Sequence, residues 1–127
     1  MEKILIVEDN EKNMKLVRDI VRHGGHETIE AATGVDGVRL ARERRPDLIL
    51  MDIQLPDMDG ATALGRLRAE AVTKAIPVVA VTAFAMLSDR DRLLGAGFDG
   101  YLAKPIDVKA FPEQVRRYCE TSRSEAR

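Results

Sequence analysis

The stretch Leu48-Ile49-Leu50-Met51-Asp52 consists of four apolar residues followed by an acid. Two further apolar runs resemble it, Ile4-Leu5-Ile6-Val7 and Val78-Val79-Ala80-Val81. Each run is short, rich in branched side chains and uninterrupted by polar residues. Such runs are typical of strands that are buried on both faces, as in a parallel sheet covered by helices on both sides. The three runs therefore predict the central strands of a parallel sheet.

Two further strand segments contain more polar residues than these runs and predict the edges of the sheet. Apolar residues at helical spacing, such as Met14, Val17 and Val21, predict helices between the strands. The expected strands span residues 3–7, 27–31, 48–52, 77–82 and 99–103, and the expected helices span 11–23, 34–44, 60–71, 88–95 and 107–120. Five such units predict an α/β fold, a doubly wound five-stranded parallel sheet with five helices and right-handed crossovers. The two polar strands belong outermost, so the expected strand order is 2-1-3-4-5.

The composition predicts one globular domain. The chain has 127 residues, of which 45% are hydrophobic and 32% charged, and its 20 basic and 21 acidic residues leave a net charge of −1. This balance argues against a dedicated nucleic-acid binder. Its apolar runs are too short to span a membrane, and the single cysteine fits a reducing cytoplasm. We expect a cytoplasmic protein with one domain over residues 1–120 and a loose tail over 121–127.

Polar side chains stand where the central strands end. Glu8 and Asp9 follow the first strand, Asp52 ends the third, Thr82 ends the fourth, and Lys104 follows the fifth. The carboxyl ends of parallel strands meet at one edge of the sheet, where ligands of open α/β folds bind. Two carboxylates about 4 Å apart repel by roughly 4 kcal/mol at an effective dielectric near 20. The cluster therefore needs a cation, a proton or Lys104, and its oxygen ligands favour Mg²⁺ or Mn²⁺.

Each of these residues alone has an ordinary structural explanation. An acid after a strand commonly caps a helix or a turn, Thr82 could be a cap, and Lys104 could be a surface charge. The combination at corresponding strand ends is what indicates a functional site.

The sequence resembles the receiver domain of two-component response regulators over essentially its whole length. The matching motifs are Ile4-Leu5-Ile6-Val7-Glu8-Asp9-Asn10, Leu48-Ile49-Leu50-Met51-Asp52-Ile53-Gln54-Leu55-Pro56, Met58-Asp59-Gly60, Val81-Thr82-Ala83 and Tyr101-Leu102-Ala103-Lys104-Pro105. The resemblance implies the flavodoxin-like receiver fold. It also implies a phosphorylation switch that catalyses only its own phosphorylation and dephosphorylation and signals through protein–protein binding.

The resemblance further implies roles for the acids. Asp52 takes a phosphoryl group from a phosphohistidine on a sensor histidine kinase or a histidine phosphotransfer protein. Asp9, Asp52 and the backbone carbonyl of Gln54 hold Mg²⁺, and Glu8 assists through water. Many receivers carry two aspartates after the first strand, whereas this chain has Glu8 and then Asp9.

The remaining implied roles concern the phosphoryl group and the switch. Thr82 and Lys104 contact the phosphoryl oxygens, and the Tyr101 ring turns inward when Thr82 moves. The Lys104–Pro105 peptide bond is expected to be cis.

The resemblance also implies that two side chains border the path of hydrolytic water. Gln54 could orient the water, and bulky Phe84 obstructs its approach.

A downstream protein partner is expected to bind the face formed by the segments 88–95, 99–103 and 107–120.

Three alternatives compete with this interpretation. A phosphatase of the haloacid-dehalogenase type also uses an aspartate after a hydrophobic strand, but it needs a second acid two residues later, where this chain has Gln54. A flavodoxin-like cofactor binder needs a phosphate-binding loop after the first strand, where Glu8-Asp9-Asn10 would repel phosphate. A receiver that does not depend on phosphorylation would not need the complete set of acids, threonine and lysine.

Overall fold

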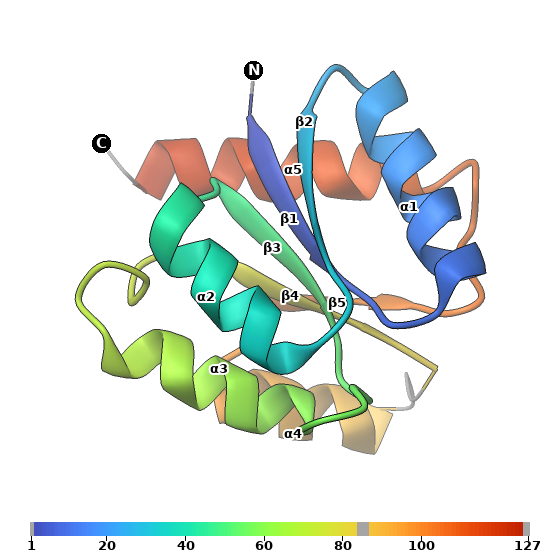
Figure 1. Cartoon of the computed structure of the whole chain (residues 1–127). Helices are drawn as coiled ribbons and strands as arrows, with labels where there is room; N and C mark the ends of the chain where they lie inside the picture. The colour runs from blue at the N-terminus through green and yellow to red at the C-terminus, as the bar shows by residue number, and fades with distance from the viewer. Residues whose placement is uncertain (1, 84–86, 126–127) are drawn as a thin grey trace.

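Within the described residues, 2–83 and 87–125, five strands alternate with five helices (Figure 1). The structure is a computed structural model, and it describes the backbone alone for residues 87–90 and 121–125. The strands are β1 (Lys3–Val7), β2 (Glu27–Ala31), β3 (Leu48–Asp52), β4 (Val78–Thr82) and β5 (Gly100–Ala103). The helices are α1 (Glu11–His23), α2 (Gly34–Arg44), α3 (Gly60–Ala69), α4 (Leu87–Ala96) and α5 (Phe111–Glu125). All strand pairs are parallel in the predicted order β2-β1-β3-β4-β5.

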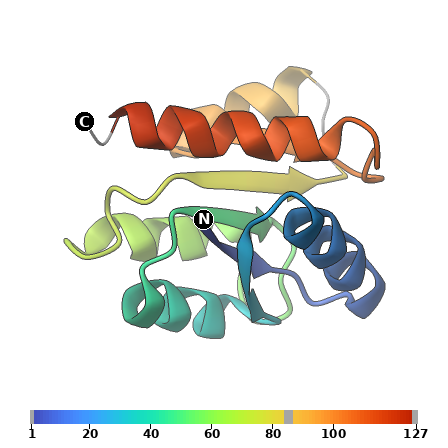
Figure 2. The same cartoon turned by 90° about the horizontal axis from the view of Figure 1, so that it is seen from above.

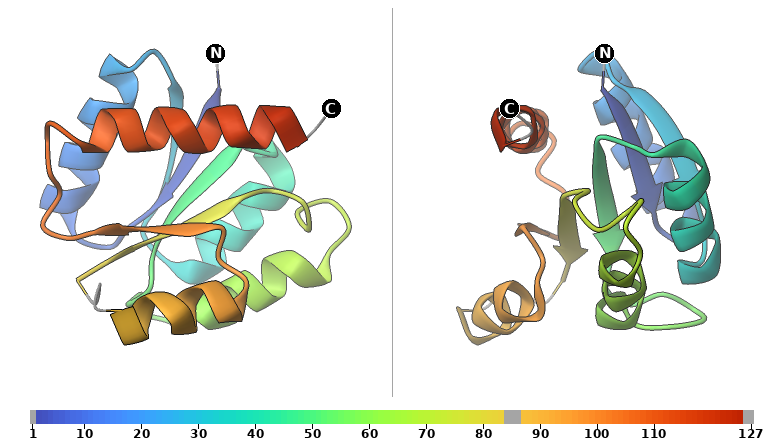
Figure 3. Two further views of the ribbon diagram at one scale, coloured as in Figure 1. Left: turned by 180° about the vertical axis from the view of Figure 1, so that it is seen from behind. Right: turned by 90° about the vertical axis from the view of Figure 1, so that its left-hand side faces the viewer.

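Helices cover both faces of the sheet. Helices α1 and α5 contribute to the same apolar cluster and so pack on one face. In the view from behind, α5 crosses in front of the strands (Figure 3). Helices α2, α3 and α4 pack on the other, so that α5 and α2 lie on opposite sides of the strands (Figure 2). This arrangement explains why all residues of β3 and β4 are buried, whereas the edge strand β2 alternates between buried and exposed residues.

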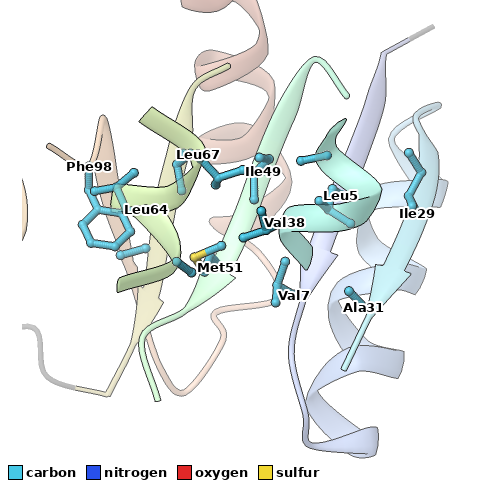
Figure 4. Packing of buried hydrophobic residues seen from close by; sticks show 14 of the residues in the cluster. Leu5, Val7, Ile29, Ala31, Val38, Ile49, Met51, Leu64, Leu67 and Phe98 are labelled. Atoms are coloured by element: carbon cyan, nitrogen blue, oxygen red, sulfur yellow. The ribbon is translucent and has the colours of Figure 1, made fainter. Parts of the chain in front are cut away.

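The core consists of two apolar clusters, one on each face of the sheet. Members of the first cluster, seen in Figure 4, come from β1, β3, α2 and α3: Leu5, Val7, Ile49, Met51, Val38, Leu64 and Leu67. Successive strand residues point to opposite faces, so each central strand contributes to both clusters. Burial on both faces is the reason that the central strands are continuously apolar.

The register of the sheet brings the strand ends together. Val7 pairs with Met51, Asp52 with Val81, and Thr82 with Ala103. The residues that end or follow these strands therefore meet at one edge of the sheet.

Helix α3 is shorter than predicted, because its last turn is closed by a side chain. The buried Thr73 hydroxyl donates a hydrogen bond of 2.6 Å to the Leu67 carbonyl, and Glu70 leaves the helical conformation. A threonine hydroxyl can satisfy a backbone carbonyl in place of the next helical amide. The helix consequently ends at Ala69 and not at residue 71.

Helix α5 begins and ends later than predicted. Residues 108–110 form a turn in which an Asp107 carboxylate oxygen accepts hydrogen bonds from the amides of Lys109 and Ala110, and the helix begins at Phe111. At the other end, residues 121–125 are helical, so the predicted helix end at residue 120 is wrong and α5 ends at Glu125. This stretch contains no glycine or proline that would end the helix.

The described helices include none that is both long and apolar enough to cross a membrane.

Candidate functional site

Three carboxylates meet at the carboxyl edge of the sheet. Each of Glu8, Asp9 and Asp52 offers one oxygen, and the three oxygens lie within 4.8 Å of one another. Glu8 is 4% exposed and Asp52 is 8% exposed, whereas Asp9 is exposed. The structure thus brings the three acids together as the sequence predicts.

The Lys104 ammonium lies between two of these acids. Its Nζ donates hydrogen bonds of 2.8 Å to Glu8 Oε1 and 3.0 Å to Asp52 Oδ2. Burial raises the pKa of Glu8, and the hydrogen bond from Lys104 offsets only part of that effect. Burial acts to lower the pKa of Lys104, but the hydrogen bonds to Glu8 and Asp52 outweigh it, so this pKa is raised. The Lys104–Pro105 peptide bond is cis, as expected.

Glu8 and Asp9 are adjacent in sequence but occupy different environments. The second oxygen of Glu8 accepts a hydrogen bond of 3.2 Å from the Asn10 amide, so both Glu8 oxygens have partners. The Asn10 side chain in turn caps α1 by accepting a hydrogen bond of 3.0 Å from the Asn13 amide. The Asn10 amide at the start of α1 therefore helps to hold the Glu8 carboxylate in its buried position, whereas the Asp9 side chain is exposed to solvent.

Asp52 is oriented through both of its oxygens. The Gln54 amide donates a hydrogen bond of 2.9 Å to Asp52 Oδ1, and Lys104 binds Oδ2. The Gln54 side chain is exposed.

Two further predicted residues, Thr82 and Tyr101, lie on the two strands beyond β3. Thr82 is fully buried at the end of β4, and its carbonyl accepts a hydrogen bond of 2.7 Å from the Lys104 amide. Tyr101 is half-buried on β5. Phe84, predicted to obstruct water, lies outside the described residues.

A hollow of about 490 Å³ opens beside the acids. Its lining includes Glu8, Asp9, Met14 and Arg18 from the start of the chain, together with Glu30 at the end of β2. Sequence reasoning missed this hollow, because its lining residues belong to elements that only the fold brings together. The hollow borders the exposed Asp9 on the α1 side of the site.

The acids suit a hard divalent cation. One ammonium cannot neutralise three neighbouring carboxylates, and carboxylate oxygens are the ligands that Mg²⁺ and Mn²⁺ prefer. Exposed Asp9 leaves room for the waters that Mg²⁺ usually retains. The residues present therefore fit Mg²⁺.

Comparison with known proteins identifies the class to which this fold and site belong. Residues 4–116 match the family described as the response regulator receiver domain, and the chain belongs to that family. It is similar to the polar-differentiation response regulator DivK of Brucella anthropi, with 48% identity over 92% of this chain and 95% of that protein. The haloacid-dehalogenase alternative receives no support from these matches.

Solved structures agree with this assignment. The receiver domain of a sensor histidine kinase from Pseudomonas aeruginosa, crystallised with a magnesium ion in its active-site cleft, is 36% identical. It has a TM-score of 0.85 and the match covers 94% of this chain and 98% of that one. A response regulator solved in its Mn²⁺-bound form is 26% identical, with a TM-score of 0.72 and coverage of 92% and 91%.

The raised pKa of Glu8 predicts a pH dependence of stability. Because the folded state holds the Glu8 proton more tightly than the unfolded state, this shift contributes stability below the ordinary pKa of 4.5. That contribution is lost as the pH rises through the folded pKa. We expect the free energy of unfolding of the native protein to fall, relative to that of Glu8→Gln, as the pH rises above 4.5. Urea denaturation in the presence of a chelator measures this difference, and parallel pH curves would contradict it.

Proposed function

We propose that this protein is a phosphorylation switch in which Asp52 accepts a phosphoryl group from a phosphohistidine on a sensor histidine kinase or a histidine phosphotransfer protein. The orientation of Asp52 carries the proposal. This carboxylate stands at the end of a central strand, and two separate donors hold its oxygens. Membership in the receiver family supports the same conclusion.

The transfer exchanges one bond to phosphorus for another. An Asp52 oxygen attacks phosphorus in line with the departing imidazole nitrogen, so an O–P bond forms as the P–N bond breaks. Charge spreads over the phosphoryl oxygens during this step, and positioning and charge neutralisation supply most of the catalysis. Lys104 is already beside Asp52 and can move its hydrogen bond to a phosphoryl oxygen. Thr82, at the end of the next strand, supplies a hydroxyl to another.

Asp9, Asp52 and the Gln54 carbonyl would hold Mg²⁺, or Mn²⁺, and Glu8 would assist through water. The cation would supply further positive charge to the phosphoryl oxygens. The inward position of Glu8, with both oxygens bonded, supports an indirect role, and the exposure of Asp9 supports a direct one.

The same proposal covers the fate of the phosphoryl group. Gln54 would border the path of the hydrolytic water, and bulky Phe84 would obstruct it, so that loss of the phosphoryl group would be slow. In this proposal the protein catalyses only its own phosphorylation and dephosphorylation. The proposed location of the protein is the cytoplasm.

The output surface is proposed to be the α4–β5–α5 face, which would bind a downstream protein. Half-buried Tyr101 borders a hollow of about 330 Å³ on this face, lined also by Gln114, Arg117 and Tyr118. An inward turn of Tyr101 that follows Thr82 would reshape the hollow, and phosphorylation would shift the population toward that state.

Phosphorylation is expected on Asp52 alone. Acetyl phosphate with Mg²⁺ should add one hydroxylamine-labile phosphoryl group to the native protein and none to Asp52→Ala, because the variant lacks the attacking oxygen. Intact mass spectrometry measures the gain. Asp91→Ala, which removes an exposed carboxylate of α4, serves as the control and should be modified like the native protein. A labile phosphoryl group on Asp52→Ala would overturn the assignment.

Mg²⁺ affinity should depend more on Asp9 than on Glu8. Losing a direct ligand costs more affinity than losing a group that acts through water or through Lys104. Isothermal titration calorimetry should therefore give a larger dissociation constant for Asp9→Ala than for Glu8→Ala. Equal losses would mean that Glu8 is also a direct ligand.

Activation should alter the α4–β5–α5 face. The phosphate mimic beryllofluoride, bound at Asp52, is expected to change amide exchange in α4, β5 and α5, because Thr82 and Tyr101 couple these elements to the site. Exchange measured by mass spectrometry with and without the mimic tests this. Changes confined to α1 and α2 would contradict the proposed output face.

A further inference from the structure

The loop between β3 and α3, residues 53–59, is closed at its neck. Gln54 and Asp59 form an isolated antiparallel bridge, and the Gly60 amide donates a hydrogen bond of 2.8 Å to the Ile53 carbonyl. A side chain at position 60 would have its Cβ 2.8 Å from the Ile53 Cα, so the approach of the two backbones requires glycine. These contacts hold the ends of the loop to each other but not its far side.

The far side of the loop is bound to helix α2. Asp57 Oδ1 accepts a hydrogen bond of 2.8 Å from the Gly34 amide, and Asp57 Oδ2 accepts one of 2.9 Å from the Val35 amide. The first amides of a helix have no partner within the helix, and the positive end of the helix dipole favours a carboxylate there. The N-cap residue of α2, Thr33, binds the Asp36 amide at 3.1 Å, so the two caps serve different amides.

A packing contact accompanies these hydrogen bonds. Met58 lies directly against Gly34, where an added Cβ would come within 2.5 Å of the Met58 Cγ atom. The hydrogen bonds from Gly34 and Val35 also hold the pKa of Asp57 below its ordinary value, so the carboxylate that binds them stays charged. Two adjacent loop residues thus dock on the first turn of α2.

We infer that Asp57 is a positioning residue for the cation site: by tying the loop to α2, it fixes the Gln54 peptide, whose carbonyl would bind the cation. The inference rests on the proposed role of the Gln54 carbonyl. Asp57 is not a member of the Glu8, Asp9 and Asp52 cluster, so it acts through the loop. A loop that is pinned at both its neck and its far side needs no further ordering when the cation binds.

The test compares Mg²⁺ affinity among matched variants by isothermal titration calorimetry. Asp57→Ala is expected to raise the dissociation constant roughly tenfold, the lower end of the loss seen when support for a metal ligand is removed. Asp57→Asn retains one acceptor oxygen and should lose less. Thr33→Val removes a cap from the same helix without touching the loop, so its dissociation constant should stay at the native value.

Amide exchange and thermal denaturation distinguish positioning from stability. In Asp57→Ala the Gly34 and Val35 amides should lose protection, and affinity should fall more than in Thr33→Val for a similar loss of stability. Affinity that falls in step with stability in both variants would overturn the inference. If the native protein binds Mg²⁺ and both Asp57→Ala and Asp57→Asn bind it with the same dissociation constant, this inference alone is overturned. A native protein that does not bind Mg²⁺ would overturn the proposed cation site and this inference with it.

Discussion

The contact of the Lys104 ammonium with Glu8 and Asp52 is the interaction on which the site depends. It joins residues 96 and 52 positions apart in sequence and connects the ends of β1, β3 and β5. Two mostly buried carboxylates without a counter-ion would be strongly unfavourable, and removing one partner of a buried ion pair typically costs about 3–5 kcal/mol. The positive charge of Lys104 reduces the repulsion between the acids in the folded protein, but one ammonium does not neutralise all three carboxylates.

This shortage of positive charge is useful for signalling. A site with too few positive charges favours a cation, and a phosphoryl group on Asp52 would compete with Glu8 for the Lys104 ammonium. The backbone amide of Lys104 is also bound to the Thr82 carbonyl, and Lys104 directly follows the strand that carries Tyr101. In the proposed switch, this connection would link the charge balance of the site to the shape of the surface beside β5. Such coupling needs only a small shift between two packings of the same elements.

The loop after β3 connects the site to the opposite side of the sheet from α1 and α5. Asp57 and Met58 attach it to α2, while Gln54 lies beside Asp52. Helix α2 is consequently part of the support of the site, although it contributes no residue to the acidic cluster. The acids are thus held from several elements at once, which is how rigid sites are generally built.

Local patterns in the sequence were sufficient for the fold and for the acidic cluster. Apolar runs identified the buried strands, polar runs identified the edges, and the acids Glu8, Asp9 and Asp52 follow from the rule that parallel strands end at one edge. Tertiary contacts alone decided the end of α3, which depends on Thr73 reaching Leu67, and the docking of Asp57 on residues 22 and 23 positions away. They also decided which acids Lys104 binds and which way Glu8 turns. The physical reason is that periodicity records burial, which is averaged along an element, whereas a hydrogen bond between distant side chains depends on the position of single atoms after the chain has packed.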